Sequence, residues 1–509
     1  MFESASLKHK IDKATFGREE PKLREALLNA QYDLKQKGSF PVLILIAGVE
    51  GAGKGETVNL LNEWMDPRHI ETHAFFEPSS EEAERPAQWR FWKALPPKGK
   101  IGIFFGAWHS MPIIQRVFGG LEEGEFAPQL SEITRLEKML CDEGVLLLKY
   151  WFHLSRGQMR KRLRELEKDP RTRWRVTERE WEYYKRYRKF VKVCEPFLRR
   201  TSSAEAPWII IPGADPEYRV LTMGRHLLSA MRERIDEKPL KRLPDRTPPL
   251  APTIDKLNVL RALELNQPLE KSTYQKQLAK WQGRLNELSR DPRMQELSIV
   301  AVFEGNDAAG KGGAIRRVTG ALDARSYSNV SIAAPTEEER AQPYLWRFWR
   351  HAPGKSRFTI FDRSWYGRVL VERVEGFCSE ADWMRAYSEI NDFEQVLVRN
   401  GVVLVKFWLA VSKDEQFRRF KKRETIAFKR FKITEEDWRN RKKWDAYERA
   451  VCDMVDRTST SVAPWTLVEA NNKYYARIKV LKTLTRALEA ALESVKQGKK
   501  GKKGKKRRK

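Results

Sequence analysis

One repeat limits how this chain can fold, because its two halves carry matching residues at a constant separation of 257 positions. Lys54 and Lys311 form one such pair, each inside a glycine-rich loop. Tryptophan is rare, so several tryptophans sharing one offset indicate an internal duplication, and a period this long makes each copy a whole domain. The tryptophan pairs at this offset are Trp89 and Trp346, Trp92 and Trp349, Trp108 and Trp365, Trp151 and Trp408, Trp181 and Trp438, and Trp208 and Trp465.

Each glycine-rich loop follows an apolar run and precedes a helical stretch, which is the order found in phosphate-binding loops. Backbone N–H groups and the positive end of a helix then converge on one point, and the lysine adds a mobile cation. We therefore expect each copy to hold phosphate. In the C-terminal copy the expected phosphate-binding residues of the loop are Gly305, Asn306, Asp307, Ala308, Ala309, Gly310, Lys311, Gly312 and Gly313.

Apolar runs in each copy alternate with helical stretches. In the C-terminal copy these runs are 299–303, a run that ends at Phe361, and 402–409. Such continuous apolar runs are typical of parallel strands covered on both faces. We predict an α/β protein of two tandem P-loop kinase-like domains, each a parallel sheet flanked by helices with a helical lid.

Composition places the boundaries of these domains. A proline-rich, charged stretch lies between the copies, and such a stretch is stiff and poor in backbone donors. We predict an N-terminal domain over 1–235, a linker over 236–255, the second domain over 256–495, and a disordered basic tail over 496–509.

Charge and cysteine content restrict the partners and the compartment. The formal net charge is +28, which points to a polyanionic partner such as nucleic acid, an anionic membrane or an inorganic phosphate polymer. The four cysteines are scattered without metal-site or disulfide spacing, so we expect a reducing, cytoplasmic setting. No apolar run approaches the length of a membrane span, and we expect no membrane association.

Differences between the copies predict where chemistry occurs. Asp362 and Arg363 at the end of a strand in the C-terminal copy align with Phe105 and Gly106 in the N-terminal copy. Gly312 stands where a magnesium-binding Ser or Thr usually follows the loop lysine, so Asp307 and Asp362 become the candidate ligands for Mg²⁺. We predict an active C-terminal copy and an inactive N-terminal copy.

Arginines outside the loop are further candidates for phosphate contacts. Arg368 aligns with Met111, and Arg423 aligns with Leu166. Arg423 and Arg430 belong to a cation-rich segment, 417–449, which we interpret as a closing lid of two helices and a loop. The alternatives are that the segment is a solvated basic face, and that Arg368, Glu372 and Glu375 are ordinary surface charges.

Two repeated motifs have structural interpretations. Thr177 and Thr434 are each followed by acidic residues and are expected to begin helices. The sequence Trp-Arg-Phe-Trp occurs at 89–92 and at 346–349. Its aromatic residues could stack on a nucleobase, but we expect them to lie in the core.

The loop at 305–313 together with Phe361, Asp362, Arg363, Ser364, Trp365 and Tyr366 resembles the polyphosphate kinase 2 family. The resemblance covers residues 255–490 and, in weaker form, 15–235. A fused pair with a degenerate first copy is similar to the two-domain class of polyphosphate:AMP phosphotransferases. It implies inorganic polyphosphate and AMP/ADP as partners and Mg²⁺ as cofactor. It also implies that Asp307 and Asp362 are essential acids, that Lys311 is the loop lysine, and that Arg363 and Arg423 contact phosphate.

Two other functions remain as alternatives. One is an enzyme that extends nucleoside diphosphates to triphosphates, making ATP or GTP. The other is a non-catalytic polyanion-binding protein, although paired carboxylates beside a phosphate site would repel an anion in the absence of a metal, and we do not expect nucleic acid as the partner. The oligomeric state stays open, with a homo-oligomer among the alternatives.

Overall fold

The computed structural model describes residues 2–237 and 258–506 and divides into two compact units. Unit 1 consists of Met1–Pro78, Arg90–Leu240 and Pro335–Arg347, and unit 2 consists of Ser79–Trp89, Lys241–Ala334 and Phe348–Lys509. Residues 238–255 of the predicted linker lie outside the described residues.

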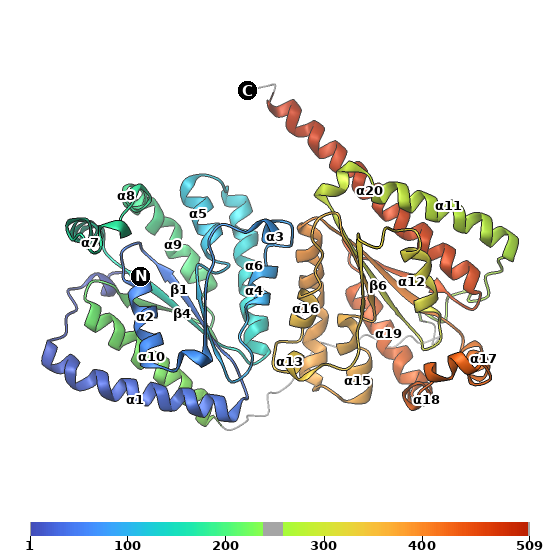
Figure 1. Cartoon of the computed structure of the whole chain (residues 1–509), viewed down its shortest axis with the longest axis horizontal. Helices are drawn as coiled ribbons and strands as arrows, with labels where there is room; N and C mark the ends of the chain where they lie inside the picture. The colour runs from blue at the N-terminus through green and yellow to red at the C-terminus, as the bar shows by residue number, and fades with distance from the viewer. Residues whose placement is uncertain (1, 238–257, 507–509) are drawn as a thin grey trace. The chain divides into compact units, whose positions relative to one another are not determined.

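Unit 1 contains a parallel five-stranded sheet in the order β2-β3-β1-β4-β5 (Figure 1). Its central strand is buried along almost its whole length, because it has neighbours on both edges and helices on both faces. The strands are β1 (Val42–Gly48), β2 (Ile70–Ala74), β3 (Ile101–Phe105), β4 (Leu146–His153) and β5 (Trp208–Pro212).

Unit 2 repeats this topology in the order β10-β9-β6-β8-β7, again with parallel pairing throughout. The central strand β6 lies between β8 and β9, as β1 lies between β3 and β4. The prediction of two tandem α/β domains with parallel sheets is confirmed. The strands are β6 (Ser298–Gly305), β7 (Tyr327–Ser331), β8 (Phe358–Asp362), β9 (Val402–Ala410) and β10 (Trp465–Glu469).

Helices cover both faces of each sheet (Figure 1). In unit 1, α1 packs along α10, and in unit 2, α11 packs along α20. The helices of the first half are α1 (Lys13–Lys37), α2 (Lys54–Trp64), α3 (Ser80–Ala83), α4 (Trp89–Lys93), α5 (Ser110–Phe118), α6 (Glu123–Asp142), α7 (Arg156–Lys168), α8 (Glu178–Lys185), α9 (Tyr187–Thr201) and α10 (Pro216–Asp236). Those of the second half are α11 (Lys271–Ser289), α12 (Lys311–Thr319), α13 (Glu337–Arg340), α14 (Trp346–Trp349), α15 (Val371–Glu375), α16 (Glu380–Arg399), α17 (Lys413–Glu424), α18 (Glu435–Lys442), α19 (Trp444–Thr458) and α20 (Lys473–Lys506).

Short 3₁₀ helices complete the two halves, and η3 and η6 occur at matching places. They are η1 (Ser4–Ser6), η2 (Pro67–His69), η3 (Arg173–Arg175), η4 (Pro292–Glu296), η5 (Trp365–Arg368) and η6 (Ala427–Lys432). In unit 2, α17, η6 and α18 span most of 417–449, the segment that we predicted to be a lid of two helices and a loop, and we call this segment the lid.

Helix ends and core aromatics agree with the sequence. Thr177 and Thr434 form capping boxes at the starts of α8 and α18. The tryptophans of both Trp-Arg-Phe-Trp motifs are buried, which confirms the core interpretation.

Helix α20 continues to Lys506, past residue 495, where a disordered tail was expected to begin. Lysine is a good helix former, so the basic sequence can extend the helix.

The register of β6 brings the expected site residues to one edge of the sheet. Phe303 on β6 lies beside Asp362 on β8, and Gly305 lies beside Leu409 on β9. Loops that follow the carboxyl ends of parallel strands usually carry the ligand site.

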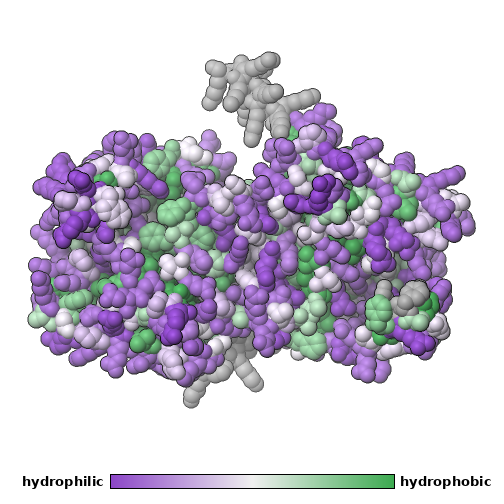
Figure 2. All heavy atoms as spheres, viewed as in Figure 1, coloured by the Kyte–Doolittle hydropathy of each residue, from purple (hydrophilic) through white to green (hydrophobic). Residues whose placement is uncertain are grey.

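The face in Figure 2 is mostly hydrophilic, with apolar residues in separate small patches. No helix in 2–237 or 258–506 is both long and apolar enough to cross a membrane.

Candidate active site

The C-terminal phosphate loop occupies residues 305–311 between β6 and α12. A Cβ atom at Gly305 would lie 2.5 Å from the carbonyl oxygen of Leu409, so glycine is needed there for the close approach to β9. Gly310, with φ of 110°, leads into α12, which Lys311, Gly312 and Gly313 begin. The Lys311 ammonium donates to the carbonyl oxygen of Gly305 at 2.8 Å. The helix start and this ammonium place positive charge at one point, as a phosphate group requires.

Two polar side chains brace this loop. The Asn306 Oδ1 accepts from the N–H of Val411 at 3.3 Å, which ties the loop to the segment after β9. Arg419 on α17 is buried and donates to the carbonyl oxygens of Ala308 and Ala309, each at 2.9 Å. Its other nitrogens donate to the carbonyl oxygens of Ala470 and Asn471 and pair with Glu415. Arg419 was expected among the lid cations, but its donors are used within the fold, and it serves as a brace.

Asp307, Asp362 and Arg363 come together beside the loop. The Arg363 Nη2 lies 3.6 Å from the Asp307 Oδ1, and its Nη1 lies 3.7 Å from a carboxylate oxygen of Glu436 on α18. Burial lowers the pKa of the Arg363 guanidinium, but the carboxylates of Asp307, Glu304, Glu436 and Asp362 outweigh it and raise the pKa overall. The guanidinium therefore stays charged in this acidic surrounding.

Asp307 and Asp362 are also the side chains that could hold a magnesium ion. Within the described residues, no group of three or more His, Cys, Asp or Glu side chains is arranged to hold a metal ion. Magnesium is usually held by one or two carboxylates, with waters and substrate phosphates as its other ligands. Two carboxylates beside a phosphate loop fit that requirement.

The other predicted arginines lie on the segment after β8 and on the lid. Arg368 on η5 pairs with Glu372 at 3.3 Å. Arg423 lies in the last turn of α17, where its charge lowers the pKa of Asp437, although burial and Asp307 raise that pKa overall. Arg430 on η6 donates from Nε to the carbonyl oxygen of Glu424 at 3.0 Å. Arg423 thus lies near the cluster of acids, while Arg368 and Arg430 have partners elsewhere.

The lid contacts the loop through a residue that we did not predict. The Asn440 Nδ2 on α18 donates to the Asp307 Oδ2 at 2.9 Å, and the Tyr447 hydroxyl donates to the Asn440 Oδ1 at 3.1 Å. Glu375, which was open to interpretation as a surface charge, is nearly buried and pairs with Lys443 at 2.9 Å and with Arg439 at 3.1 Å. The offset of 257 could have indicated both residues, since Asn440 aligns with Tyr183 and Glu375 with Phe118.

A second unpredicted residue is Glu304, a buried acid on β6 just before the loop. Its Oε1 accepts a hydrogen bond from the Ser364 hydroxyl at 2.8 Å. The aligned residues in the N-terminal copy are Ala47 and Ala107, so the same comparison of the copies could have found this pair.

The loop lysine of the N-terminal copy is neutralised by its own loop. The Lys54 ammonium donates to the carbonyl oxygens of Gly48 and Val49, each at 3.0 Å, and to the Glu50 carboxylate at 3.1 Å. Glu50 aligns with Asp307, but the partners of Asp307, Arg363 and Asn440, are replaced by Gly106 and Tyr183. The carboxylate therefore turns to Lys54, an arrangement that does not favour the phosphate binding expected of this loop.

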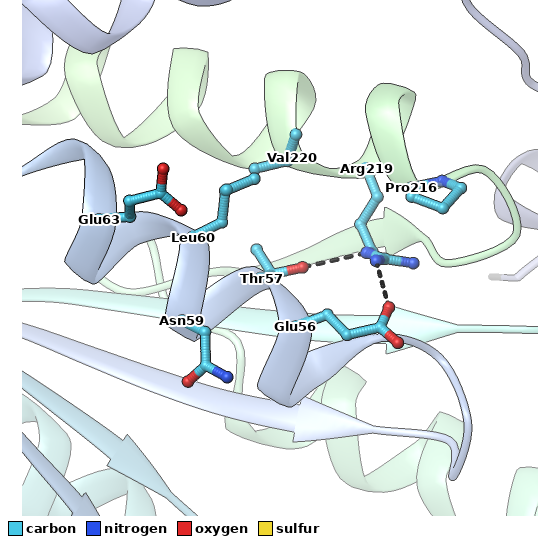
Figure 3. Close-up of a pocket in the computed structure, with 8 residues that line it drawn as sticks. All are labelled: Glu56, Thr57, Asn59, Leu60, Glu63, Pro216, Arg219 and Val220. Carbon is cyan, nitrogen blue, oxygen red and sulfur yellow. Dashed lines mark hydrogen bonds and ion pairs between the residues drawn. The ribbon is translucent and has the colours of Figure 1, made fainter. Parts of the chain in front are cut away.

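A buried arginine also covers the N-terminal loop (Figure 3). The Arg219 guanidinium donates to the Thr57 hydroxyl and to the Glu56 carboxylate, each at 3.0 Å. A Cβ atom at Gly53 would lie 2.1 Å from this guanidinium, so the arginine rests directly on the loop. Arg219, Thr57 and Glu56 also border a cavity of about 350 Å³ between α2 and α10.

Comparisons with known proteins agree with this architecture. A family model described as polyphosphate kinase 2 matches residues 10–239 and 268–496. A polyphosphate:AMP phosphotransferase of Pseudomonas aeruginosa is 58% identical over 496 residues, covering 97% of this chain and 100% of that protein. A protein of the same description from Acinetobacter johnsonii is 38% identical over 477 residues, which are 92% of this chain and 96% of that protein. A crystal structure from Pseudomonas aeruginosa PA01, described as polyphosphate kinase 2, superposes with a TM-score of 0.87 at 56% identity, over 97% of this chain and 100% of that chain.

Proposed function

We propose that this chain, which belongs to the polyphosphate kinase 2 family, transfers the terminal phosphoryl group of inorganic polyphosphate to AMP, giving ADP, and that the C-terminal copy carries out the transfer. Similarity to polyphosphate:AMP phosphotransferases over nearly the whole chain supports the reaction. The observation that supports its location is the cluster of Lys311, Asp307, Asp362 and Arg363 at the C-terminal loop.

The residues of this cluster act by alignment and by neutralising charge. The terminal phosphate of the polymer binds at the start of α12, where Lys311 exchanges the Gly305 carbonyl oxygen for a phosphate oxygen. An oxygen of the AMP phosphate attacks the terminal phosphorus, the bond to the polymer breaks, and the shortened polymer leaves with the negative charge. The AMP phosphate is already ionised at neutral pH, so no strong base is needed, and Asp307 orients the acceptor.

Arginines and the lid complete the site. Arg363 lies beside Asp307 and is placed to reach an oxygen of the transferred group. Closure of the lid brings Arg423 and Arg430 towards the polymer, where an arginine on a transferring phosphoryl group can contribute about 10³-fold or more to the rate. The positive charge of the chain suits a long inorganic polyanion as the donor.

Magnesium is the cofactor that these residues would hold. Asp362 and Asp307 would supply carboxylate oxygens, and the phosphates of the substrates would supply further ligands. The ion neutralises charge on the phosphate oxygens when it is bound. The acids then serve as ligands and as orienting groups rather than as proton acceptors.

The N-terminal copy has no catalytic role in this proposal. Phe105 and Gly106 stand where Asp362 and Arg363 lie, and Lys54 is paired with Glu50.

All four cysteines of the chain are free thiols within the described residues, which supports a reducing, cytoplasmic setting.

The two loop lysines provide a matched test of the location. Lys311→Ala should lower the rate of ADP formation from polyphosphate and AMP by about 10²- to 10³-fold, because it removes a cation from the transferred group. Lys54→Ala removes the aligned residue and should leave the rate unchanged. Asp362→Asn should also abolish turnover without unfolding the chain. Loss of activity in Lys54→Ala with full activity in Lys311→Ala would indicate catalysis in the N-terminal copy and contradict the proposal.

The acceptor and the donor are tested in the same assay. AMP and ADP are offered separately with polyphosphate in excess, and ATP replaces polyphosphate as donor in a parallel series. We expect rapid formation of ADP from AMP and polyphosphate. Preferred formation of ATP from ADP would identify a nucleoside diphosphate kinase instead.

A further inference from the structure

Glu304 forms an interaction behind the site that the transfer mechanism above does not use. It belongs to β6, is 5% exposed, and receives the Ser364 hydroxyl hydrogen bond at 2.8 Å. The Ser364 oxygen in turn accepts from the N–H of Tyr366 at 3.4 Å. A single buried carboxylate therefore connects the strand before the phosphate loop to the turn after β8.

That turn holds Arg363 in an unfavourable backbone conformation. Its φ is 64°, in the left-handed region that side chains other than glycine rarely adopt. The N–H of Arg363 donates to the carbonyl oxygen of Phe303 at 3.0 Å, and Ser364 lies next in the chain. Surrounding contacts have to fix such a conformation, because the residue alone would leave it.

The N-terminal copy lacks each part of this arrangement at the same register. Ala47 replaces Glu304, Ala107 replaces Ser364, and Gly106 with φ of 78° replaces Arg363. The turn keeps its backbone shape there without a side chain that needs support. The buried carboxylate and the hydroxyl thus occur together with the strained arginine and with Asp362.

The charged groups that face Glu304 are those of the proposed site. Lys311, Arg363 and Asp362 all act on its carboxylate, with Lys311 the strongest of the charges that attract it. Glu304 is nevertheless buried, so it lies behind these groups rather than among the substrates.

We propose that Glu304 is a positioning residue for phosphoryl transfer: through the Ser364 hydroxyl it holds the turn that places Asp362 and Arg363 beside the phosphate loop. This inference rests on the proposed function, since it assumes that the C-terminal copy is the active one. Displacement of aligned groups by about 1 Å can lower a rate by about 10²-fold without unfolding the protein.

The test compares variants of the full-length chain. Glu304→Ala and Ser364→Ala should each lower kcat by about 10²-fold with little change in KM for AMP, because the acceptor still binds but is poorly aligned. The double variant should be no slower than either single variant, since both substitutions break one connection. Glu304→Gln keeps an oxygen that accepts from Ser364 and should retain most of kcat.

Thr359→Ala is the matched control. Thr359 is also buried on β8, and its hydroxyl donates to the carbonyl oxygen of His351 at 3.0 Å, on the early part of the strand. It should lower the unfolding temperature much as Ser364→Ala does, yet leave kcat unchanged.

Two results would overturn the inference. One is that Ser364→Ala has the kcat of the wild-type chain. The other is that Glu304→Gln loses as much activity as Glu304→Ala, which would make the charge beside Lys311 the important feature. Should Glu304→Ala fail to fold, the Ser364→Ala variant decides the question alone. Failure of the proposed function would give a different result from failure of this inference. Either the wild-type chain would form no ADP, or the Lys54→Ala variant would lose activity.

Discussion

Residues with left-handed backbone conformations differ between the two copies. Ala308, Ser356 and Arg363 have φ of 60°, 61° and 64°, and they are the non-glycine residues with positive φ in the described part of the chain. Their aligned residues are Gly51, Gly99 and Gly106, with φ of 78°, 83° and 78°. A side chain in this conformation costs about 1 kcal/mol. Ala308 and Arg363 lie in the proposed site, so the C-terminal copy keeps local strain where the N-terminal copy has relaxed it.

One buried ion pair is the same in both copies. Lys406 pairs with Glu394 at 2.7 Å, and Lys149 pairs with Glu137 at 2.6 Å, each almost completely buried. Its presence in the copy that we propose to be inactive indicates a role in the fold. The pair has one more partner in the C-terminal copy, where the Tyr366 hydroxyl donates to Glu394 and accepts from Lys406.

We expect the residue that aligns with Tyr366, His109, to make the N-terminal copy sensitive to acid. His109 is buried, and burial lowers its pKa to about 3; burial likewise lowers the pKa of His153 to about 4. The unfolded state takes up these protons near pH 6.5, before the folded state does. The free energy of unfolding should therefore fall as pH drops below 6.5, by about 1.4 kcal/mol per pH unit for each histidine. Urea unfolding measured at several pH values checks this slope.

His109→Tyr is the control for that prediction. It removes one of the three N-terminal histidines whose pKa burial lowers, which are His109, His153 and His226, and it supplies the hydroxyl that bonds Glu394 and Lys406 in the other copy. The loss of stability between pH 6.5 and 4 should be smaller than that of the wild-type chain, because one of the three groups no longer takes up a proton on unfolding. An unchanged slope in His109→Tyr would show that His109 does not cause the acid sensitivity.

One contact of the lid, with the segment after the third strand of each sheet in chain order, differs between the two copies. In the C-terminal copy, Glu375 pairs with Lys443 and Arg439, and Asn440 reaches Asp307. In the N-terminal copy, the Phe118 and Tyr183 rings meet at 5.2 Å, and the Arg186 guanidinium lies 4.8 Å from the Phe118 ring centre. Polar contacts can exchange with water and with phosphate, whereas packed aromatic rings resist opening. We therefore expect this contact to open more easily in the C-terminal copy.

Loss of the Glu375 carboxylate should loosen that lid. Glu375→Gln weakens two ion pairs whose cations are partly exposed. We therefore expect the free energy of opening the lid to fall by about 1 kcal/mol, which corresponds to about fivefold faster trypsin cleavage within 417–449. Glu380→Gln, which neutralises an exposed acid at the start of α16, is the control and should not change the cleavage rate. Equal cleavage of both variants would argue against an anchoring role for Glu375.

Charge is the property that acts over the whole molecule. Ten of the basic residues lie in 496–509, and the face shown in Figure 2 is largely hydrophilic. Attraction between many cations and a polyanion depends steeply on salt, because counterions are released on binding. The tail should therefore contribute to binding of long polyphosphate most strongly at low ionic strength.

Removal of residues after 495 tests this contribution. At low salt the shortened chain should show a KM for long polyphosphate that is higher by about tenfold, and the difference should disappear at high salt. A full-length chain with the lysines at 499, 500, 502, 503, 505 and 506 changed to glutamine separates charge from length and should behave like the shortened chain. A salt profile identical to that of the wild-type chain would make the tail a passive feature.

Local patterns in the sequence were sufficient for the architecture. Apolar runs and glycine loops predict strand, loop and helix units because their spacing reflects backbone geometry, and an offset that pairs tryptophans predicts two copies. The capping threonines predict helix starts for the same local reason. Comparison of the copies likewise identified Asp362 and Arg363 as residues found in one half alone.

Tertiary structure decided which partner each side chain has. Arg419 is a brace rather than a lid cation, Glu304 lies behind the site, Asn440 reaches Asp307, and Lys54 turns to Glu50. Each of these contacts except the last joins segments that are far apart in the chain. Charge and spacing in the sequence identified the residues that could act. Packing fixes the direction of each side chain, so only the folded chain determined which of their charges stay available to a phosphate.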